Sequence, residues 1–89
     1  MILKRSSEVK KEEATADGFN GMFARYLWTA QDGCRKFAMR LMEFEPGGHT
    51  SYHSHREEHE FFFLEGEPAY VDAEGKETRL QPGDTVYAW

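Results

Sequence analysis

The order of apolar and polar positions along the chain predicts a protein built from short strands. Aromatic and apolar residues gather in brief runs, and Gly, Pro, Asn and Asp separate these runs at intervals of roughly 8–12 residues. No long segment repeats with the period of a helix. The expected strands are residues 23–28, 36–44, 60–64, 69–72, 78–80 and 85–89, with a shorter extended piece at 50–55. The pattern therefore favours an all-β antiparallel sandwich or barrel.

The first twenty residues have a different character, because they are mostly polar and charged. Met1–Lys4 is expected to form a short first strand, followed by a solvated loop or one helical turn. Turns are expected at residues 31–33, 45–48 and 81–84, where Gly and Pro recur.

A chain of 89 residues is long enough for one small domain, so we expect residues 1–89 to form a single unit. A chain of this size buries only about 60–65% of its unfolded surface. A bound metal, a partner subunit or both would help to stabilise it.

Charge and composition narrow the class of function. The net charge of −5 argues against nucleic acid as a partner, since phosphate binding needs clustered Lys and Arg. The longest apolar run, residues 61–64, is far too short to cross a membrane. No apolar signal segment follows Met1, so a cytoplasmic location is expected. Cys34 is the single cysteine, which excludes an internal disulfide.

The main chemical signal is a group of histidines within eleven residues: His49, His53, His55 and His59. In an extended segment, residues two apart point to the same face, so His53 and His55 would project together, roughly 6.8 Å apart. His59 follows after a polar turn that can return it to that face. Three neutral imidazoles suit a divalent transition metal, with bonds of about 2.0–2.2 Å, and leave coordination positions open for water or substrate.

These residues resemble the first motif of the cupin family, G-x5-HxH-x3,4-E-x6-G. Residues 47–66 fit it from Gly47 to Gly66, with His59 where many cupins carry Glu. The looser spacing would make Glu60 the ligand instead, but then only five residues precede Gly66. The register therefore favours His59 as the ligand and leaves Glu60 on the opposite face. The resemblance implies a small β-barrel or jelly roll with the histidines inside its mouth.

The second cupin motif, G-x5-P-x-G-x2-H-x3-N, is matched only at its start, over residues 83–89. Gly83 can serve as its first glycine, but Trp89 stands where proline is expected and is the last residue of the sequence. The family's fourth metal ligand would fall beyond it. Either the chain is truncated at its C-terminus, or a partner or water completes the coordination shell.

Four further residues are candidates for a substrate pocket beside the metal. Arg40 shares strand parity with Met42 and Phe44, and its guanidinium could hold a carboxylate if that face lines the barrel. The alternative is a solvent-facing residue or an ion pair. Phe61, Phe63 and Tyr52 could wall an apolar cavity, although ordinary core packing explains them equally well.

The sequence thus predicts a metal-binding cupin that holds one divalent ion of manganese, iron, copper, nickel or zinc through His53, His55 and His59. We expect a small metalloenzyme with oxygenase-type chemistry on a small organic molecule, because three neutral ligands leave the charge of the metal uncompensated. The alternative is a non-catalytic ligand-binding or sensor protein. A homodimer is expected from the small core and from the resemblance.

Overall fold

The computed structural model describes residues 1–52 and 58–88 of the chain, which divides into two compact units, Met1–Tyr52 and His53–Trp89. The described part contains seven strands and two single 3-10 turns, with no α-helix. Every strand pair is antiparallel. Within those residues, no helix has the length and apolar character needed to span a membrane.

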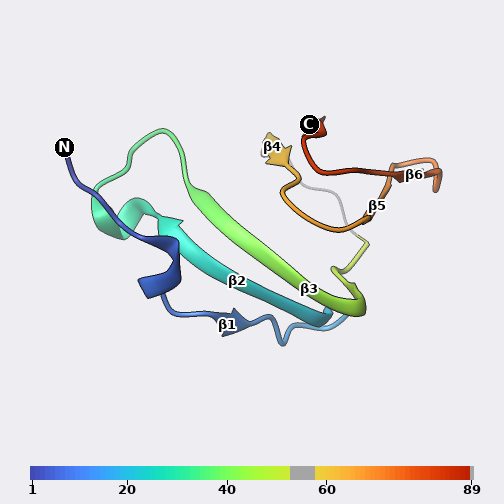
Figure 1. The fold of residues 1–89 in the computed structure, drawn as a ribbon, viewed down its shortest axis with the longest axis horizontal. Helices are drawn as coiled ribbons and strands as arrows, with labels where there is room; N and C mark the ends of the chain where they lie inside the picture. Colours follow the sequence, from blue (N-terminus) through green and yellow to red (C-terminus); the bar gives the residue numbers. More distant parts are fainter. Residues whose placement is uncertain (53–57, 89) are drawn as a thin grey trace. The chain divides into compact units, whose positions relative to one another are not determined.

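The first unit is a three-stranded sheet in the order β1-β2-β3 (Figure 1). β1 is Glu12–Glu13, β2 is Asn20–Trp28 and β3 is Met39–His49. The long β2–β3 pair aligns Met22 with Phe44 and Tyr26 with Arg40. The expected strand at residues 23–28 is therefore confirmed.

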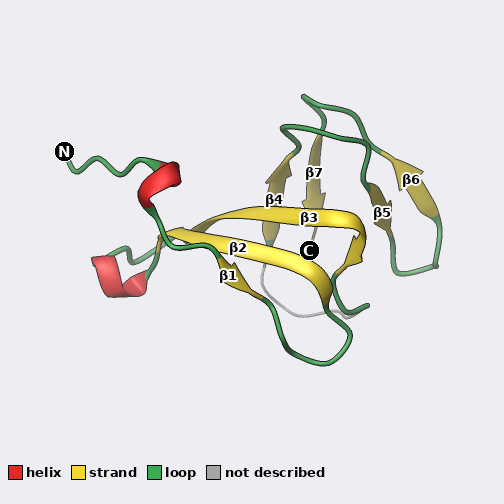
Figure 2. Cartoon of the chain, turned by 60° about the horizontal axis from the view of Figure 1, so that its bottom comes forward, coloured by secondary structure: helices red, strands yellow, loops and turns green. Residues whose placement is uncertain are grey.

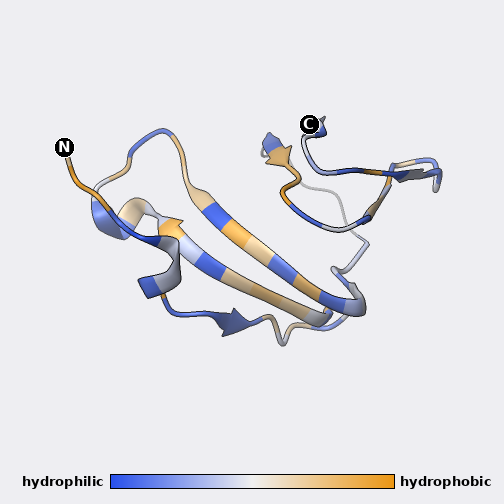
Figure 3. Ribbon diagram, viewed as in Figure 1, coloured by the Kyte–Doolittle hydropathy of each residue, from blue (hydrophilic) through white to orange (hydrophobic). Residues whose placement is uncertain are grey.

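Figure 3 shows β2 and β3 as mainly hydrophobic ribbons interrupted by hydrophilic bands. Met22 and Ala24, two residues apart, are 4% and 3% exposed. Their partners on β3 are Phe44 and Met42, so these four side chains share one face. The apolar core of this unit lies on that face.

The expected strand at Met1–Lys4 is wrong. Residues 1–5 have no regular structure, and a 3-10 turn, η1 (Ser6–Glu8), follows them, which fits the expected helical turn. Side-chain hydrogen bonds, and not strand pairing, connect this N-terminal segment to β2. The Lys4 Nζ donates to the Leu27 carbonyl at 2.9 Å, and the Arg25 guanidinium donates to the Val9 carbonyl at 2.7 Å.

The connection from β2 to β3 contains the second 3-10 turn, η2 (Ala30–Asp32). The Thr29 hydroxyl accepts from the Gln31 N–H, and the Asp32 carboxylate accepts from the Thr29 N–H at 2.9 Å. Gly33 ends the turn at φ 93°, a left-handed conformation that favours glycine. The turn expected at 31–33 is confirmed in this form.

β3 differs from the expected strand 36–44 at both ends. It begins at Met39, and it continues through the expected turn at 45–48 to His49. Asn20 pairs with His49, and Met22 pairs with Phe44. Between these two pairs β2 has one residue, Gly21, whereas β3 has four, residues 45–48. The Pro-Gly-Gly sequence is thus accommodated as a bulge within the pairing, and does not end the strand.

Residues 58–88 of the second unit form two antiparallel pairs (Figure 2). β4 (His59–Phe62) pairs with β7 (Thr85–Ala88), and β5 (Ala69–Val71) pairs with β6 (Glu77–Arg79). The Asp72 carboxylate accepts from the N–H groups of Glu74 and Lys76, each at 2.9 Å, and so closes the β5–β6 turn. These elements confirm the expected strands near residues 60–64, 69–72, 78–80 and 85–89.

Candidate metal centre

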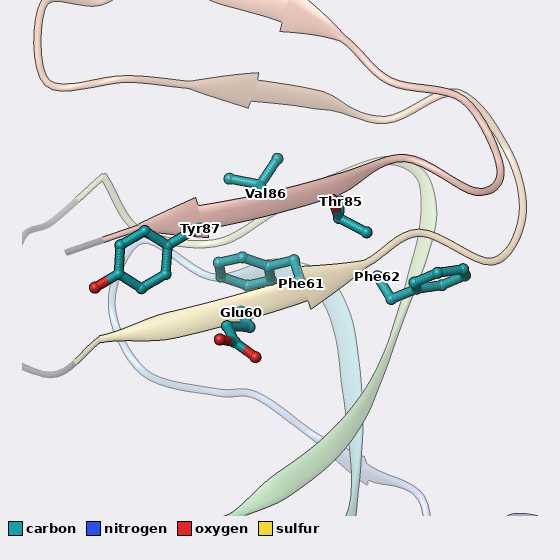
Figure 4. Close-up of a pocket in the computed structure, with 6 residues that line it drawn as sticks. All are labelled: Glu60, Phe61, Phe62, Thr85, Val86 and Tyr87. Atoms are coloured by element: carbon teal, nitrogen blue, oxygen red, sulfur yellow. The ribbon is translucent and has the colours of Figure 1, made fainter.

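β4 carries the one predicted metal ligand that lies among the described residues. Its register pairs His59 with Ala88 and Phe61 with Val86, while Glu60 pairs with Tyr87. Exposure alternates along the strand, so that His59 and Phe61 are half-buried and Glu60 and Phe62 are exposed. Figure 4 shows Glu60 pointing away from the Phe61 ring. His59 and Glu60 therefore lie on opposite faces of β4, as the sequence predicted.

The half-buried face of β4 is a row of rings. His59 stacks on Phe61 with centroids 5.8 Å apart, and Phe61 stacks on Phe63 at 6.2 Å. Tyr70 of β5 meets Phe61 at 6.3 Å in a tilted arrangement. Rings at these separations attract one another and keep water from the surface between them. The imidazole of His59 therefore stands at the end of an apolar wall.

The turn before β7 fixes the far end of this row. Phe63 N–H donates to the Asp84 carbonyl at 3.0 Å, and Gly83 N–H donates to the Phe63 carbonyl at 2.7 Å. The Asp84 carboxylate accepts from the Gln81 N–H at 2.8 Å. The turn thus extends the backbone contact between β4 and β7 by one residue beyond the paired strands.

A side-chain hydrogen bond ties the residue before His59 to β7. The Tyr87 hydroxyl donates to the Glu58 carboxylate at 2.6 Å. This bond, followed by desolvation and the negative charges of Glu58 and Glu60, raises the pKa of Tyr87 above its ordinary value of 10.0. Both groups are solvent-exposed, so the bond positions the chain beside His59 and adds little to stability.

A hollow of about 430 Å³ opens along the β4–β7 pair, within the second unit. Phe61, Val86 and Tyr87 are among its lining residues (Figure 4). Its size lies within the range of small-molecule sites, about 300–1,000 Å³. Of the four residues predicted for a substrate pocket, Phe61 lines this hollow and Phe63 contacts Phe61.

The other predicted ligands, His53 and His55, lie outside the described residues. Among residues 1–52 and 58–88, no group of three or more His, Cys, Asp and Glu side chains could hold a metal ion. His49, which the sequence left outside the motif, is exposed at the end of β3, and its Nδ1 lies 3.1 Å from the Thr50 carbonyl oxygen.

Arg40 and Tyr52 belong to the first unit. Arg40 pairs with Tyr26 and lies on the same face of the sheet as the buried Met22 and Ala24. The sequence likewise predicted that Arg40 shares a face with Met42 and Phe44, which pair with Ala24 and Met22. Tyr52 is 66% exposed.

Two contacts of this region escaped the sequence analysis. Tyr70, the middle residue of β5, is half-buried between two exposed neighbours, and this alternation could have identified it as facing inward. The Tyr87–Glu58 bond joins residues 29 apart in sequence, and nothing in either local segment signals it.

A comparison with models of protein families identifies the family of this chain. The family model for the cupin domain matches residues 40–88, which is more than half of the chain. The chain therefore belongs to the cupin family, and the predicted all-β, cupin-type fold is confirmed. None of the curated proteins compared with the chain matches it.

Proposed function

We propose that this cupin is a small metalloprotein in which His53, His55 and His59 hold one divalent transition-metal ion. The observation that carries the proposal is the position of His59. Its ring is half-buried at the end of the aromatic row, whereas the competing ligand, Glu60, is exposed on the other face of β4. A neutral imidazole suits such an apolar setting better than a carboxylate, because burying a charge is costly.

The donor set fits manganese, iron, copper, nickel or zinc, because imidazole binds all of these ions. The metal, when bound, would supply Lewis-acid or oxygen-activating chemistry at positions that three protein ligands leave open. Phe61 and Phe63 would form a dry wall beside those positions.

Metal content of purified variants tests the site. We expect one equivalent of metal in the native protein and little in His53→Ala/His55→Ala or in His59→Ala. Glu60→Ala is the matched control, since it changes the adjacent residue on the other face, and it should retain the metal. Loss of metal from Glu60→Ala but not from His59→Ala would reverse the assignment of the third ligand.

For the reaction, we propose oxygenase-type chemistry on a small organic molecule. The test is oxygen uptake by protein loaded with manganese, iron(II) or copper, over a panel of small enols, phenols and hydroxy acids. Turnover above the His53→Ala control is expected. Ligand binding without turnover under any metal would instead establish a sensor or carrier.

The same proposal takes the protein to be a cytoplasmic homodimer. Several large apolar side chains are strongly exposed, among them Ile2 at 72% and Leu64 at 60%. A second copy of the chain would cover part of such a surface. Sedimentation equilibrium should give twice the mass of the chain, and a monomer at every concentration would exclude the dimer.

A further inference from the structure

The first unit contains a second hollow, formed where the β2–β3 connection returns to β3. It measures about 740 Å³, and its lining includes Trp28, Cys34, Arg35, Lys36, Phe37 and Met39. None of these residues is among those predicted to bind the metal or its substrate. The volume is within the range of small-molecule sites, about 300–1,000 Å³.

The apolar part of this groove is exposed to a degree that folding alone does not explain. Phe37 is 86% exposed and Met39 is 58% exposed, although both are large apolar side chains. Trp28, at the end of β2, is half-buried and forms a further aromatic surface of the groove. An apolar molecule that covered these three side chains would remove much of this surface from water.

The charged part of the groove is basic, in a chain whose net charge is −5. Arg35 and Lys36 are exposed, and neither forms an ion pair with any residue in the described ranges. The acidic residue nearest to them in sequence, Asp32, already pairs with Lys4 at 2.7 Å. Two cations therefore stand beside the apolar surface without an acidic partner.

Lys4 contacts the Trp28 ring that lines this groove. Its Nζ lies 4.6 Å from the centroid of the Trp28 ring, a cation–π contact that holds the ring at the groove. The Nζ also donates to Asp32 and to the Leu27 carbonyl. The orientation of Trp28 is thus supported before any ligand binds.

We propose that this groove binds a small amphiphilic anion, namely a carboxylate with an aliphatic or aromatic body. The apolar body would lie against Trp28, Phe37 and Met39, and the carboxylate would be held by Arg35 and Lys36. Arginine binds carboxylates through paired N–H donors, and lysine supplies a second positive charge. Charge complementarity selects an anion over a neutral or cationic molecule with the same apolar body. This proposal is independent of the metal site.

Cys34 supplies a direct probe of occupancy, because it is the single cysteine of the chain, is half-buried and lines the groove. The test measures how fast iodoacetamide, a neutral reagent, alkylates Cys34 in the native protein. Decanoate should slow the reaction in a saturable manner. Decylammonium, with the same alkyl chain and the opposite charge, and acetate, with the charge but no apolar body, should leave the rate unchanged.

Variants separate the two parts of the site. Arg35→Gln/Lys36→Gln should raise the Kd for decanoate about tenfold, and Phe37→Ala should do the same through lost apolar contact. Arg5→Gln/Lys10→Gln removes one Arg and one Lys elsewhere in the same unit, so it is the charge-matched control and should leave the Kd unchanged. All these side chains are exposed, and circular dichroism would verify that each variant keeps its fold.

Four results would overturn the proposal. The first is the absence of protection by decanoate up to its solubility limit. The second is equal protection by decylammonium. The third is an unchanged Kd in Arg35→Gln/Lys36→Gln. The fourth is protection of Cys34 that depends on protein concentration and not on decanoate, which would assign the groove to a second copy of the chain.

Discussion

Phe61 of β4 makes more ring contacts than its moderate burial suggests. It stacks on His59 and Phe63 and meets Tyr70, whereas its neighbour Phe62 is 64% exposed. Phe61→Ala should lower the free energy of unfolding by about 2 kcal/mol, less than for a fully buried phenylalanine. Phe62→Ala is the matched control and should cost below about 0.5 kcal/mol. Urea unfolding measures both, and equal losses would show that the ring row does not stabilise the unit.

Asp32 gives the first unit a pH-dependent contact. The Lys4 ammonium, together with the backbone N–H of Thr29, holds the pKa of Asp32 below its ordinary value of 3.8. A lowered pKa means that this stabilisation is complete above the ordinary value and is lost as pH falls through the lowered one. The contact is exposed, so salt should weaken it as well.

The corresponding experiment compares the native protein with Asp32→Asn from pH 7 down to pH 2.5. The difference in unfolding free energy should be constant near neutral pH and shrink toward zero below pH 3.8. Asp17→Asn is the control, because no hydrogen bond or ion pair to the Asp17 side chain is found within residues 1–52 and 58–88. A difference that grows on acidification would contradict the assigned contact.

At the scale of elements, the bulge between β2 and β3 depends on Gly48. A Cβ atom at this position would lie 2.5 Å from the Gly21 carbonyl oxygen and 2.9 Å from that of Glu45. Both are backbone atoms, which cannot move without disturbing the pairing. Gly48→Ala should therefore destabilise the protein by about 2–3 kcal/mol.

Gly47 provides the comparison for this bulge. Among the described residues, a Cβ there would meet nothing within 4 Å, and the obstacle is its φ of 78°. Gly47→Ala should therefore cost about 1 kcal/mol. Thermal unfolding of the two variants would test the ranking, which fails if Gly47→Ala proves the more damaging.

The elements also show which features a sequence can predict. β2, β4 and the β5–β6 hairpin follow from short runs of apolar and aromatic residues and from turn residues, both of which are local properties. β1 could not be predicted, since it consists of Glu12 and Glu13, and only their pairing with Ala24 and Phe23 makes them a strand. The error at Met1–Lys4 has the same origin, because an apolar start predicts a strand only where a partner strand is available.

At the scale of the whole molecule, the apolar core is small. Among the described residues, the buried apolar side chains are Met22, Ala24 and Leu80. A chain of 89 residues with so little buried surface depends on further sources of stability. The motif in the sequence predicted the family and the face of His59, because spacing and strand parity determine both. It could not predict the contact of Tyr70 with Phe61, because Tyr70 comes from a different strand pair.

Metal binding should be one such source of stability, because a ligand that binds only the folded chain shifts the unfolding equilibrium. A free metal concentration about 100-fold above the Kd adds about 2.7 kcal/mol, which for a domain of this size corresponds to a rise in Tm of roughly 10–20 °C. Scanning calorimetry with manganese or zinc should show this rise, and a chelator should reverse it. Glu60→Ala should keep the rise and His59→Ala should lose most of it. The same rise in His59→Ala would mean that the metal binds elsewhere, for example at the exposed His49, and that the three-histidine site does not account for it.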